Sequence, residues 1–291
     1  MEQSNRESFL KAKKFLSQFK NIEFYDSEIY LLLIKANSYT NFTELIKNFD
    51  ENLANPDYFF RNIQRIKDGE PIQYVVGEAP FFDLDINVNR NVLIPRPETE
   101  GLVKLLIDEI NKNKYNHKII ADVCTGSGCI ALYLKKKFPN SEVYASDKYK
   151  DVLDVAISNF NKYHMNIITL EGSRLEPFIS RSIKLDILIS NPPYVEKMED
   201  IEENVKKFEP LNAIYLENGT RFYESYFKHY KEVMNKRFVM AFEINYDQEE
   251  KLTFLIKNYF NTNEITYKFY KDDFDRTRYL IIAGGYNESS R

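Results

Sequence analysis

The sequence predicts an α/β protein whose mostly parallel sheet follows a small bundle of helices. After residue 118, short apolar runs alternate with segments of helical periodicity, which is the pattern of a sheet covered by helices on both faces. Residues 1–70 show helical periodicity alone. With 291 residues, 43% of them apolar, the chain is long enough for two domains, or for one large core with an appendage.

The first 70 residues are expected to form a helical domain of their own. Apolar residues recur at helical spacing in the first segment, at Phe9, Ala12, Leu16 and Phe19. A second helix is expected over residues 28–36, behind Asp26 and Ser27 as possible caps. A third should begin at Asn55-Pro56, with Asn as cap and Pro in the first turn, and end at Gly69.

Residues 71–95 are expected to link the two domains as a β-hairpin. The stretch from Tyr74 to Leu93 is typical of extended chain, is interrupted by Gly77 and Pro80, and alternates apolar and polar residues over 82–86. The prolines of residues 94–100 then break regular structure and lead into a helix over 102–110.

Residues 96–291 are expected to form the α/β domain. Its predicted strands cover residues 119–123, 143–146, 167–170, 185–190 and 238–244, and its predicted helices cover 129–138, 152–163 and 222–234. Two further strand-like runs, 265–270 and 279–283, have no helix between them. They should therefore form a hairpin, which adds an antiparallel strand to the sheet.

The charge balance argues against a protein that holds nucleic acid. The net charge is −4 and the isoelectric point is near 5.7, whereas duplex DNA and long RNA are usually held by a basic face. The lysine run at 135–137 sits late in a predicted helix, where cations complement the helix dipole. We therefore expect no direct nucleic-acid binding.

The sequence indicates no metal site, membrane segment or signal peptide. Cys124 and Cys129 and the scattered histidines His117, His164 and His229 form no ligand pattern. The N-terminus is polar, and no apolar run reaches the roughly 18 residues of a membrane span. The expectation is a cytoplasmic monomer with reduced thiols.

A glycine turn after the strand at 119–123 predicts a nucleoside-binding site. Gly126 and Gly128 allow a sharp turn and a close approach by a ligand, and free N–H groups at the helix start can face it. Asp147 closes the next strand, 21 positions after Gly126, where its carboxylate can accept from both ribose hydroxyls. A tight turn without ligand has the same sequence pattern, and NAD(P), FAD and S-adenosylmethionine enzymes share it. The turn alone leaves the cofactor open.

The tetrad Asn191-Pro192-Pro193-Tyr194 follows the apolar strand at 185–190, at the end of the sheet where α/β proteins bind ligands. Alone, it could merely end the strand and start a turn. Beside the glycine turn it fits the methylation of a planar nitrogen that carries two N–H donors. The Asn191 side-chain oxygen can accept one and the Pro192 carbonyl the other, which points the lone pair at a sulfonium methyl. Tyr194 offers a ring face to the planar group.

This tetrad resembles that of the amino-methyltransferases, which methylate planar nitrogens of adenine, cytosine or glutamine. It selects S-adenosylmethionine as the cofactor, with S-adenosylhomocysteine as the product. The whole chain resembles the HemK/PrmC-type release factor glutamine methyltransferases, from the helical N-terminus nearly to the last strand. The resemblance rests on residues 69–77 (GEPIQYVVG) and 93–100 (LIPRPETE), with support from Phe208-Glu209-Pro210, Phe242-Glu243-Ile244 and the Asp-rich loop before Arg278-Tyr279.

The resemblance implies a Rossmann-like, seven-stranded class I methyltransferase domain that methylates N5 of the glutamine in the Gly-Gly-Gln loop of class I peptide chain release factors. Carried over by position, the cofactor would be held by Cys124, Thr125, Gly126, Ser127, Gly128, Asp147, Leu175 and Asn191. Catalysis would fall to Asn191, Pro192 and Tyr194, and these residues with Pro193 would hold the glutamine. The helical domain 1–70, which has no catalytic constellation, is expected to recognise the partner protein.

Three segments depart from the family pattern. Ser173-Arg174-Leu175 stands where an acidic residue usually precedes a bulky one, so the adenine contact is expected from Leu175 or from elsewhere. Cys124 stands where glycine is common, and Asn218-Gly219-Thr220 replaces a loop richer in glycine. The rival functions are an adenine-N6 nucleic acid methyltransferase with a basic cleft, a glutamine methyltransferase acting on another protein such as a ribosomal protein, and a binding module without activity.

Overall fold

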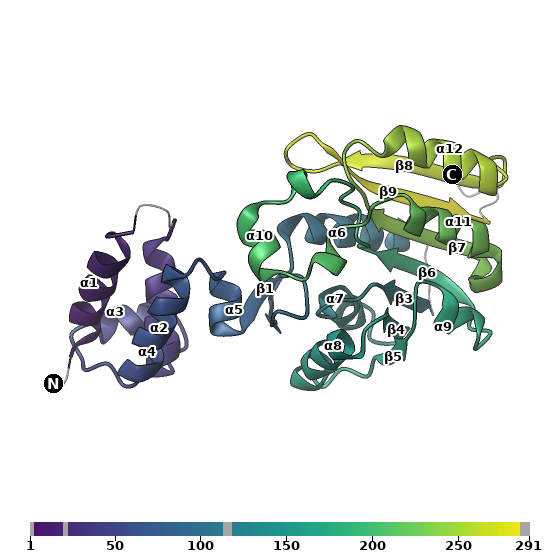
Figure 1. The fold of residues 1–291 in the computed structure, drawn as a ribbon. Helices are drawn as coiled ribbons and strands as arrows, with labels where there is room; N and C mark the ends of the chain where they lie inside the picture. Colours follow the sequence, from purple (N-terminus) through teal and green to yellow (C-terminus); the bar gives the residue numbers. More distant parts are fainter. Residues whose placement is uncertain (1–2, 20–22, 113–117, 286–291) are drawn as a thin grey trace. The chain divides into compact units, whose positions relative to one another are not determined.

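The structure is a computed structural model that describes residues 3–19, 23–112 and 118–285. The chain divides into two compact units, Met1–Glu78 and Ala79–Arg291. The first consists of helices and the second of a sheet with helices on it (Figure 1). The predicted α/β class with a helical N-terminal part is confirmed.

The first unit is a bundle of short helices around an apolar core. In α4 the predicted start is confirmed, because the Asn55 side chain caps the helix and Pro56 is its first residue. α1 ends at Leu16 and does not reach Phe19, since the chain turns at the C-cap Ser17. The helices are α1 (Asn5–Leu16), α2 (Asp26–Asn37), α3 (Phe42–Lys47), α4 (Pro56–Lys67) and α5 (Ile72–Val76).

The stretch that should be extended from Tyr74 begins instead with helix α5. Pro71 precedes this helix, and Gly77, with φ of 80°, ends it in the left-handed conformation that glycine adopts without strain. The predicted hairpin follows as a two-stranded sheet of β1 (Glu78–Phe81) and β2 (Leu84–Asn87).

A seven-stranded sheet runs through the second unit in the order β5-β4-β3-β6-β7-β9-β8. The first five strands of that order pair in parallel, and β9 pairs antiparallel with both β7 and β8, as the predicted hairpin requires. The strands are β3 (Ile119–Val123), β4 (Glu142–Asp147), β5 (Ile168–Glu171), β6 (Leu185–Ser190), β7 (Met234–Glu243), β8 (Ile265–Lys271) and β9 (Thr277–Gly284).

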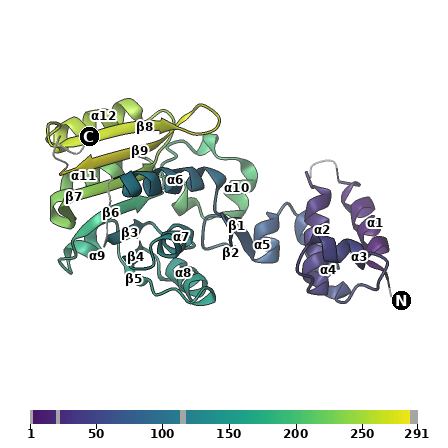
Figure 2. The ribbon, with the colours of Figure 1, turned by 180° about the vertical axis from the view of Figure 1, so that it is seen from behind.

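Helices cover both faces of this sheet (Figures 1 and 2). α6, α7 and α8 pack on one face, while α9, α11 and α12 share an aromatic and aliphatic core with the other. α12 has no counterpart among the predicted helices, and α6 begins at Pro97 rather than at Leu102. The helices of this unit are α6 (Pro97–Lys112), α7 (Cys129–Lys137), α8 (Lys150–Lys162), α9 (Glu176–Ile179), α10 (Glu203–Phe208), α11 (Arg221–Val233) and α12 (Glu249–Tyr259), with 3-10 turns η1 (Met198–Asp200) and η2 (Leu211–Ala213).

The carboxyl ends of β3, β4 and β6 meet at one edge of the sheet. In the register of the strands, Val123 at the end of β3 pairs with Ser146 of β4 and with Ser190 of β6. From β3 the chain runs outward through β4 and β5, then returns to β6 on the other side of β3. Open α/β sheets bind ligands at such a reversal of strand order. The fold therefore brings the glycine turn, Asp147 and the tetrad to this edge.

No helix in the described part of the chain is long and apolar enough to cross a membrane. The His, Cys, Asp and Glu residues of the described ranges form no group of three that could hold a metal ion. His117 lies outside those ranges.

Candidate active site

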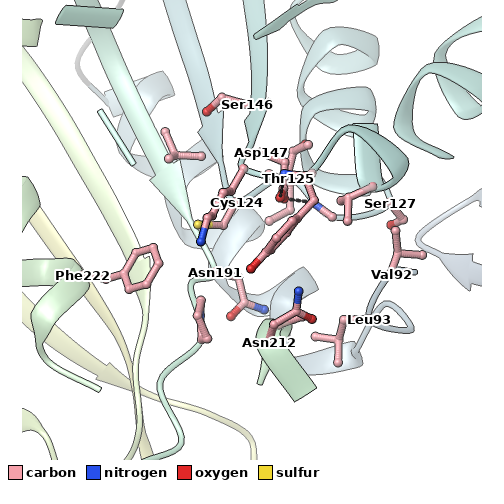
Figure 3. A pocket seen from close by; sticks show the side chains of 18 of the residues that line it. Val92, Leu93, Cys124, Thr125, Ser127, Ser146, Asp147, Asn191, Asn212 and Phe222 are labelled. Atoms are coloured by element: carbon pink, nitrogen blue, oxygen red, sulfur yellow. Dashed lines mark hydrogen bonds between the residues drawn. The ribbon is translucent and has the colours of Figure 1, made fainter. Parts of the chain in front are cut away.

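A cavity of about 320 Å³ opens at this edge of the sheet (Figure 3). The cavity is lined by the turn after β3, the end of β4, the loop after β5 and the start of the tetrad after β6. Most residues of the segments 91–99 and 212–216 also line it. Of the candidate site residues, the cavity gathers Cys124, Thr125, Gly126, Ser127, Asp147, Asn191 and Pro193. Four others lie outside its lining, namely Gly128, Leu175, Pro192 and Tyr194.

The two glycines of the turn have different surroundings. At Gly126, with φ of 55°, a Cβ atom would meet nothing within 4 Å, so the backbone is open to a ligand. At Gly128, with φ of 80°, a Cβ atom would lie 2.6 Å from the Phe160 ring of α8. Gly126 therefore leaves room in the cavity, whereas Gly128 lets α7 and α8 pack closely.

Asp147 ends β4 with its side chain directed into the cavity (Figure 3). Its carboxylate accepts the Gly126 N–H at 3.2 Å and the Tyr149 N–H at 3.4 Å, which ties the end of β4 to the glycine turn. Burial raises the pKa of this carboxyl. Each carboxylate oxygen accepts more than one hydrogen bond, so capacity for further donors remains.

Asp122 of β3 also supports this turn, although the sequence alone predicts no role for it. Its carboxylate is fully buried and accepts the Thr125 hydroxyl at 2.6 Å and the Ala131 N–H at 3.1 Å. Burial raises its pKa to about 7. The signal that could have revealed it is a charged residue in an otherwise apolar strand directly before a glycine turn.

The tetrad reaches the cavity through Asn191. The Asn191 amide donates from Nδ2 to the Thr99 hydroxyl at 3.1 Å, and its side chain faces the cavity (Figure 3). Pro192 and Pro193 are buried, and the Tyr194 hydroxyl donates to a Glu243 oxygen at 2.9 Å. Thr99 and Glu243 lie far from the tetrad in the sequence, so only the fold reveals these contacts.

The segment 173–175 places its residues differently from the expectation. Leu175 is 2% exposed and packs in the hydrophobic core, where it does not line the cavity. Ser173 and Arg174 line the cavity instead, and Phe222 from α11 joins them. The Arg174 guanidinium lies 4.8 Å from the centre of the Phe222 ring. The flat surface at this end of the cavity therefore comes from α11.

Comparisons with known proteins identify the family. Residues 101–252 match the model of the methyltransferase small domain. A release factor glutamine methyltransferase of Staphylococcus aureus is 39% identical over 206 residues, which are 70% of this chain and 73% of the relative. The chain belongs to the release factor glutamine methyltransferase family. Another member, from Clostridium acetobutylicum, is 33% identical over 263 residues, and the match covers 87% of this chain and 90% of that relative.

Solved structures support the fold of the second unit. A methyltransferase from Pyrococcus furiosus superposes with a TM-score of 0.50 at 18% identity, over 70% of this chain and 90% of that chain. The hMettl16 catalytic domain, in complex with MAT2A 3'UTR hairpin 6, gives 0.51 at 13% identity, over 71% and 77%. At these identities the likeness is one of fold.

In this methyltransferase, two family segments that are distant in sequence meet beside the cavity. Arg96, from segment 93–100, forms an ion pair with Glu209, from segment 208–210. A second Glu209 oxygen accepts the Ile94 N–H at 3.1 Å. Because most residues of the segments 91–96 and 212–216 line the cavity, this ion pair joins two of its walls.

The backbone at Cys124 explains why glycine is common at this position in the family. Cys124 adopts φ of 63°, a conformation that glycine takes without strain. Its thiol lies 3.7 Å from the Tyr226 hydroxyl, and burial raises the thiol pKa to about 12. The thiol is therefore protonated at neutral pH.

Proposed function

We propose that this protein transfers a methyl group from S-adenosylmethionine to the side-chain amide nitrogen, N5, of the glutamine in the Gly-Gly-Gln motif of class I peptide chain release factors. One observation carries the proposal. The Asn191 amide nitrogen is engaged by Thr99, which leaves the Asn191 oxygen as an acceptor at a cavity that also holds the glycine turn and Asp147. Family membership supports the substrate, since the relatives are named release factor glutamine methyltransferases.

The cavity suits S-adenosylmethionine in shape and in polar groups. Residues 124–127 and Asp147 would hold its polar part, with the open backbone at Gly126 against the ligand and the carboxylate accepting from the ribose hydroxyls. Phe222 and Arg174 would face the adenine ring. Bound S-adenosylmethionine supplies an electrophilic methyl group on its sulfonium, and S-adenosylhomocysteine is the product.

The tetrad would orient the glutamine amide. An amide nitrogen is a poor nucleophile, because its lone pair is delocalised into the carbonyl, but it carries two N–H donors. The Asn191 oxygen and the Pro192 carbonyl would each accept one, with Pro193 and the Tyr194 ring completing the pocket around the planar group. Orientation of this kind can lower a barrier by several kcal/mol, and by roughly 7–11 kcal/mol when the geometry is best.

We propose that three parts of the chain have different roles. We assign recognition of the release factor to the helical domain 1–70, a linking role to the hairpin segment 71–95, and the methyl transfer to residues 96–291. The proposed substrates act in translation termination, so the cytoplasm is the proposed site of action. We propose that the protein acts as a monomer without direct contact to nucleic acid.

Radiolabelled S-adenosylmethionine distinguishes the proposal from its rivals. The protein is incubated separately with a class I release factor, with total ribosomal protein and with adenine-containing DNA and RNA. We expect label on the release factor alone, and its loss when the motif glutamine is replaced by glutamate. Label on nucleic acid would favour the adenine-N6 activity, and label on a ribosomal protein the other protein substrate; either result without release factor labelling overturns the proposal.

A further inference from the structure

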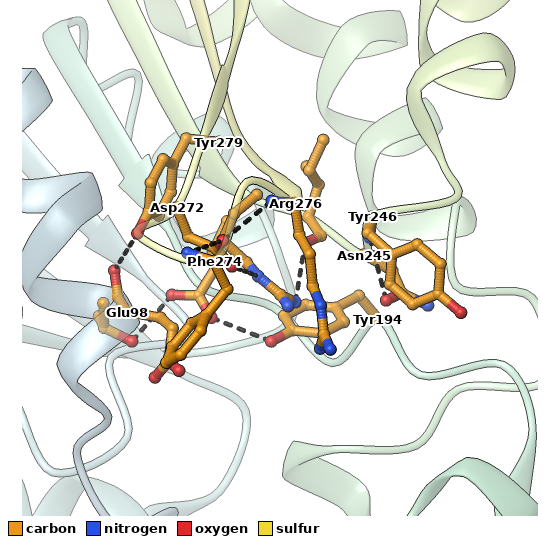
Figure 4. A network of polar contacts seen from close by, with 12 residues as sticks. Glu98, Tyr194, Asn245, Tyr246, Asp272, Phe274, Arg276 and Tyr279 are labelled. Atoms are coloured by element: carbon orange, nitrogen blue, oxygen red, sulfur yellow. Dashed lines mark hydrogen bonds and ion pairs between the residues drawn. The ribbon is translucent and has the colours of Figure 1, made fainter.

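A buried carboxylate connects both ends of the tetrad. Glu243, at the end of β7, is 2% exposed. One of its oxygens accepts the Tyr194 hydroxyl at 2.9 Å and the other accepts the Thr99 hydroxyl at 2.8 Å. Thr99 in turn accepts the Asn191 amide at 3.1 Å. Tyr194 points into this polar network, in which Tyr279 bonds to the Glu98 carbonyl (Figure 4).

The direction of these hydrogen bonds follows from the carboxylate. An ionised carboxyl group can only accept hydrogen bonds, so the Thr99 hydroxyl must donate its single hydrogen to Glu243. The Thr99 oxygen is then left with lone pairs alone and can only accept from Asn191. This forces the NH₂ group of the Asn191 amide toward Thr99 and leaves the amide oxygen to face a substrate.

We propose that Glu243, acting through Thr99, is a positioning residue that fixes the orientation of the Asn191 amide and thereby selects an N–H donor as substrate. The inference rests on the proposed function, in which Asn191 accepts from the glutamine amide. A reversed Asn191 amide would present its NH₂ group and would favour a carboxylate. The chain Glu243–Thr99–Asn191 would thus discriminate glutamine from glutamate.

The geometry around Glu243 is that of an acceptor, because the Thr99 and Tyr194 hydroxyls each donate to a different oxygen of its carboxyl group. Burial raises the pKa of this carboxyl, and the hydrogen bonds from Thr99 and Tyr194 and the positive charge of Arg278 limit the rise. The negative charge of Glu98 acts with burial. Two neutral donors on one carboxylate also satisfy both oxygens, as a buried charged group requires.

Variants of similar shape test the chain of hydrogen bonds Glu243–Thr99–Asn191, here called the relay, in the full-length protein. Thr99→Val keeps the shape and removes the hydroxyl, Thr99→Ser restores the hydroxyl, and Glu243→Gln removes the charge. Thr277→Val is the matched control, because it removes a threonine–glutamate hydrogen bond of 3.1 Å at the surface, to Glu249. Circular dichroism checks that each variant is folded, and calorimetry checks that it binds S-adenosylmethionine with the affinity of the wild type.

The first readout is single-turnover methyl transfer to a release factor at saturating concentrations. We expect Thr99→Val and Glu243→Gln to slow methyl transfer about tenfold or more, because each variant loses an oriented hydrogen bond in a site shielded from water. Thr99→Ser should recover most of the rate, and Thr277→Val should not change it. A folded Thr99→Val protein with the wild-type rate overturns the inference, and so does a Thr99→Ser protein as slow as Thr99→Val.

The second readout needs no substrate, which separates this inference from the proposed function. In ¹⁵N-labelled protein, the side-chain NH₂ signals of Asn191 are assigned by their loss in Asn191→Asp. We expect faster hydrogen exchange and a changed chemical shift in Thr99→Val and Glu243→Gln, with wild-type behaviour in Thr99→Ser and Thr277→Val. Unchanged Asn191 signals in Thr99→Val overturn the relay even if no release factor is methylated. If the wild type does not methylate a release factor but the Asn191 signals change as expected, the proposed function is overturned and the present inference is not.

Discussion

The carboxylates of Asp122 and Asp147 hold neighbouring residues of one turn. Asp122 accepts the Thr125 hydroxyl at 2.6 Å and Asp147 accepts the Gly126 N–H at 3.2 Å. Asp122 is fully buried, whereas Asp147 lines the cavity. The first should therefore govern stability and the second ligand affinity.

Replacing Asp147 by alanine should weaken the binding of S-adenosylmethionine. The lost hydrogen bonds to a charged acceptor correspond to about 1–3 kcal/mol, or roughly a fivefold to 150-fold higher Kd. Isothermal titration calorimetry measures this, with Asp151→Ala as the control, since Asp151 is exposed on the adjoining first turn of α8. An unchanged Kd would show that the ribose binds elsewhere.

Asp122 should make the protein less stable as the pH rises. Its pKa is about 7 in the folded protein against an ordinary value of 3.8, so the folded state keeps a proton that the unfolded state releases between these values. The unfolding free energy should therefore fall on the order of 2–3 kcal/mol between pH 5 and pH 8. Urea denaturation of wild type and Asp122→Asn measures this, and the variant should show the smaller fall. Parallel pH profiles would contradict the prediction.

Arg96→Ala should destabilise the second unit, because it leaves Glu209 buried without its partner. The Glu209 side chain is 2% exposed and the Arg96 side chain 33%, so the loss should be on the order of 2–4 kcal/mol, slightly below that of a fully buried pair. Lys271→Ala breaks an exposed pair with Asp275 and should change the unfolding free energy by about 1 kcal/mol or less. Equal losses in the two variants, measured by urea denaturation, would refute the distinction.

Asn191→Ala should reduce turnover about a hundredfold or more, the scale of removing one oriented group that stabilises a transition state. The fold should survive, because Asn191 lies in a loop beyond β6. Asn191→Asp keeps an acceptor but loses the donor to Thr99, so its rate should fall between those of wild type and the alanine variant. Single-turnover transfer to a release factor, with folding checked by circular dichroism, decides this. Wild-type rates in Asn191→Ala would remove Asn191 from the mechanism.

Deleting residues 1–78 should separate recognition from cofactor binding. The unit Ala79–Arg291 contains the whole cavity lining, so its affinity for S-adenosylmethionine should match that of the full chain. Transfer to an intact release factor should fall sharply, while transfer to a short Gly-Gly-Gln peptide should be equal for both proteins. Equal rates on the intact release factor would assign recognition to the second unit.

The sequence predicted those helices and strands that are marked by a few neighbouring residues. The strand at 185–190 is an uninterrupted apolar run, and Asn55-Pro56 marks a helix start without help from the fold. The helix α12 gave a weaker signal, because Leu252 and Ile256 are buried while Phe254, between them, is 65% exposed. The six-residue helix α3 is too short for periodicity to reveal it.

Some parts of the site could likewise be predicted from the sequence, and others could not. The glycine turn and the tetrad are contiguous in sequence, so their chemistry could be read before the fold was known. Thr99 lies 92 positions from Asn191, and Glu243 lies 144 positions from Thr99, so tertiary packing alone brings them together. Leu175 was assigned by position in a family pattern, but burial of its side chain in the core leaves the cavity wall to Phe222.

The position of β9 between β7 and β8 sets an order for assembly on the ribosome. β8 is made first, but among the described strands it pairs only with β9, so it cannot join the sheet until residues 277–284 have emerged. Until then β7, which carries Glu243 at its end, has an unpaired edge where β9 will bind. Such an edge can pair with other chains, so a nascent chain that stalls before β9 would be prone to aggregation. Residues 277–284 must therefore be made before the edge of β7 is covered and before β8 can join the sheet.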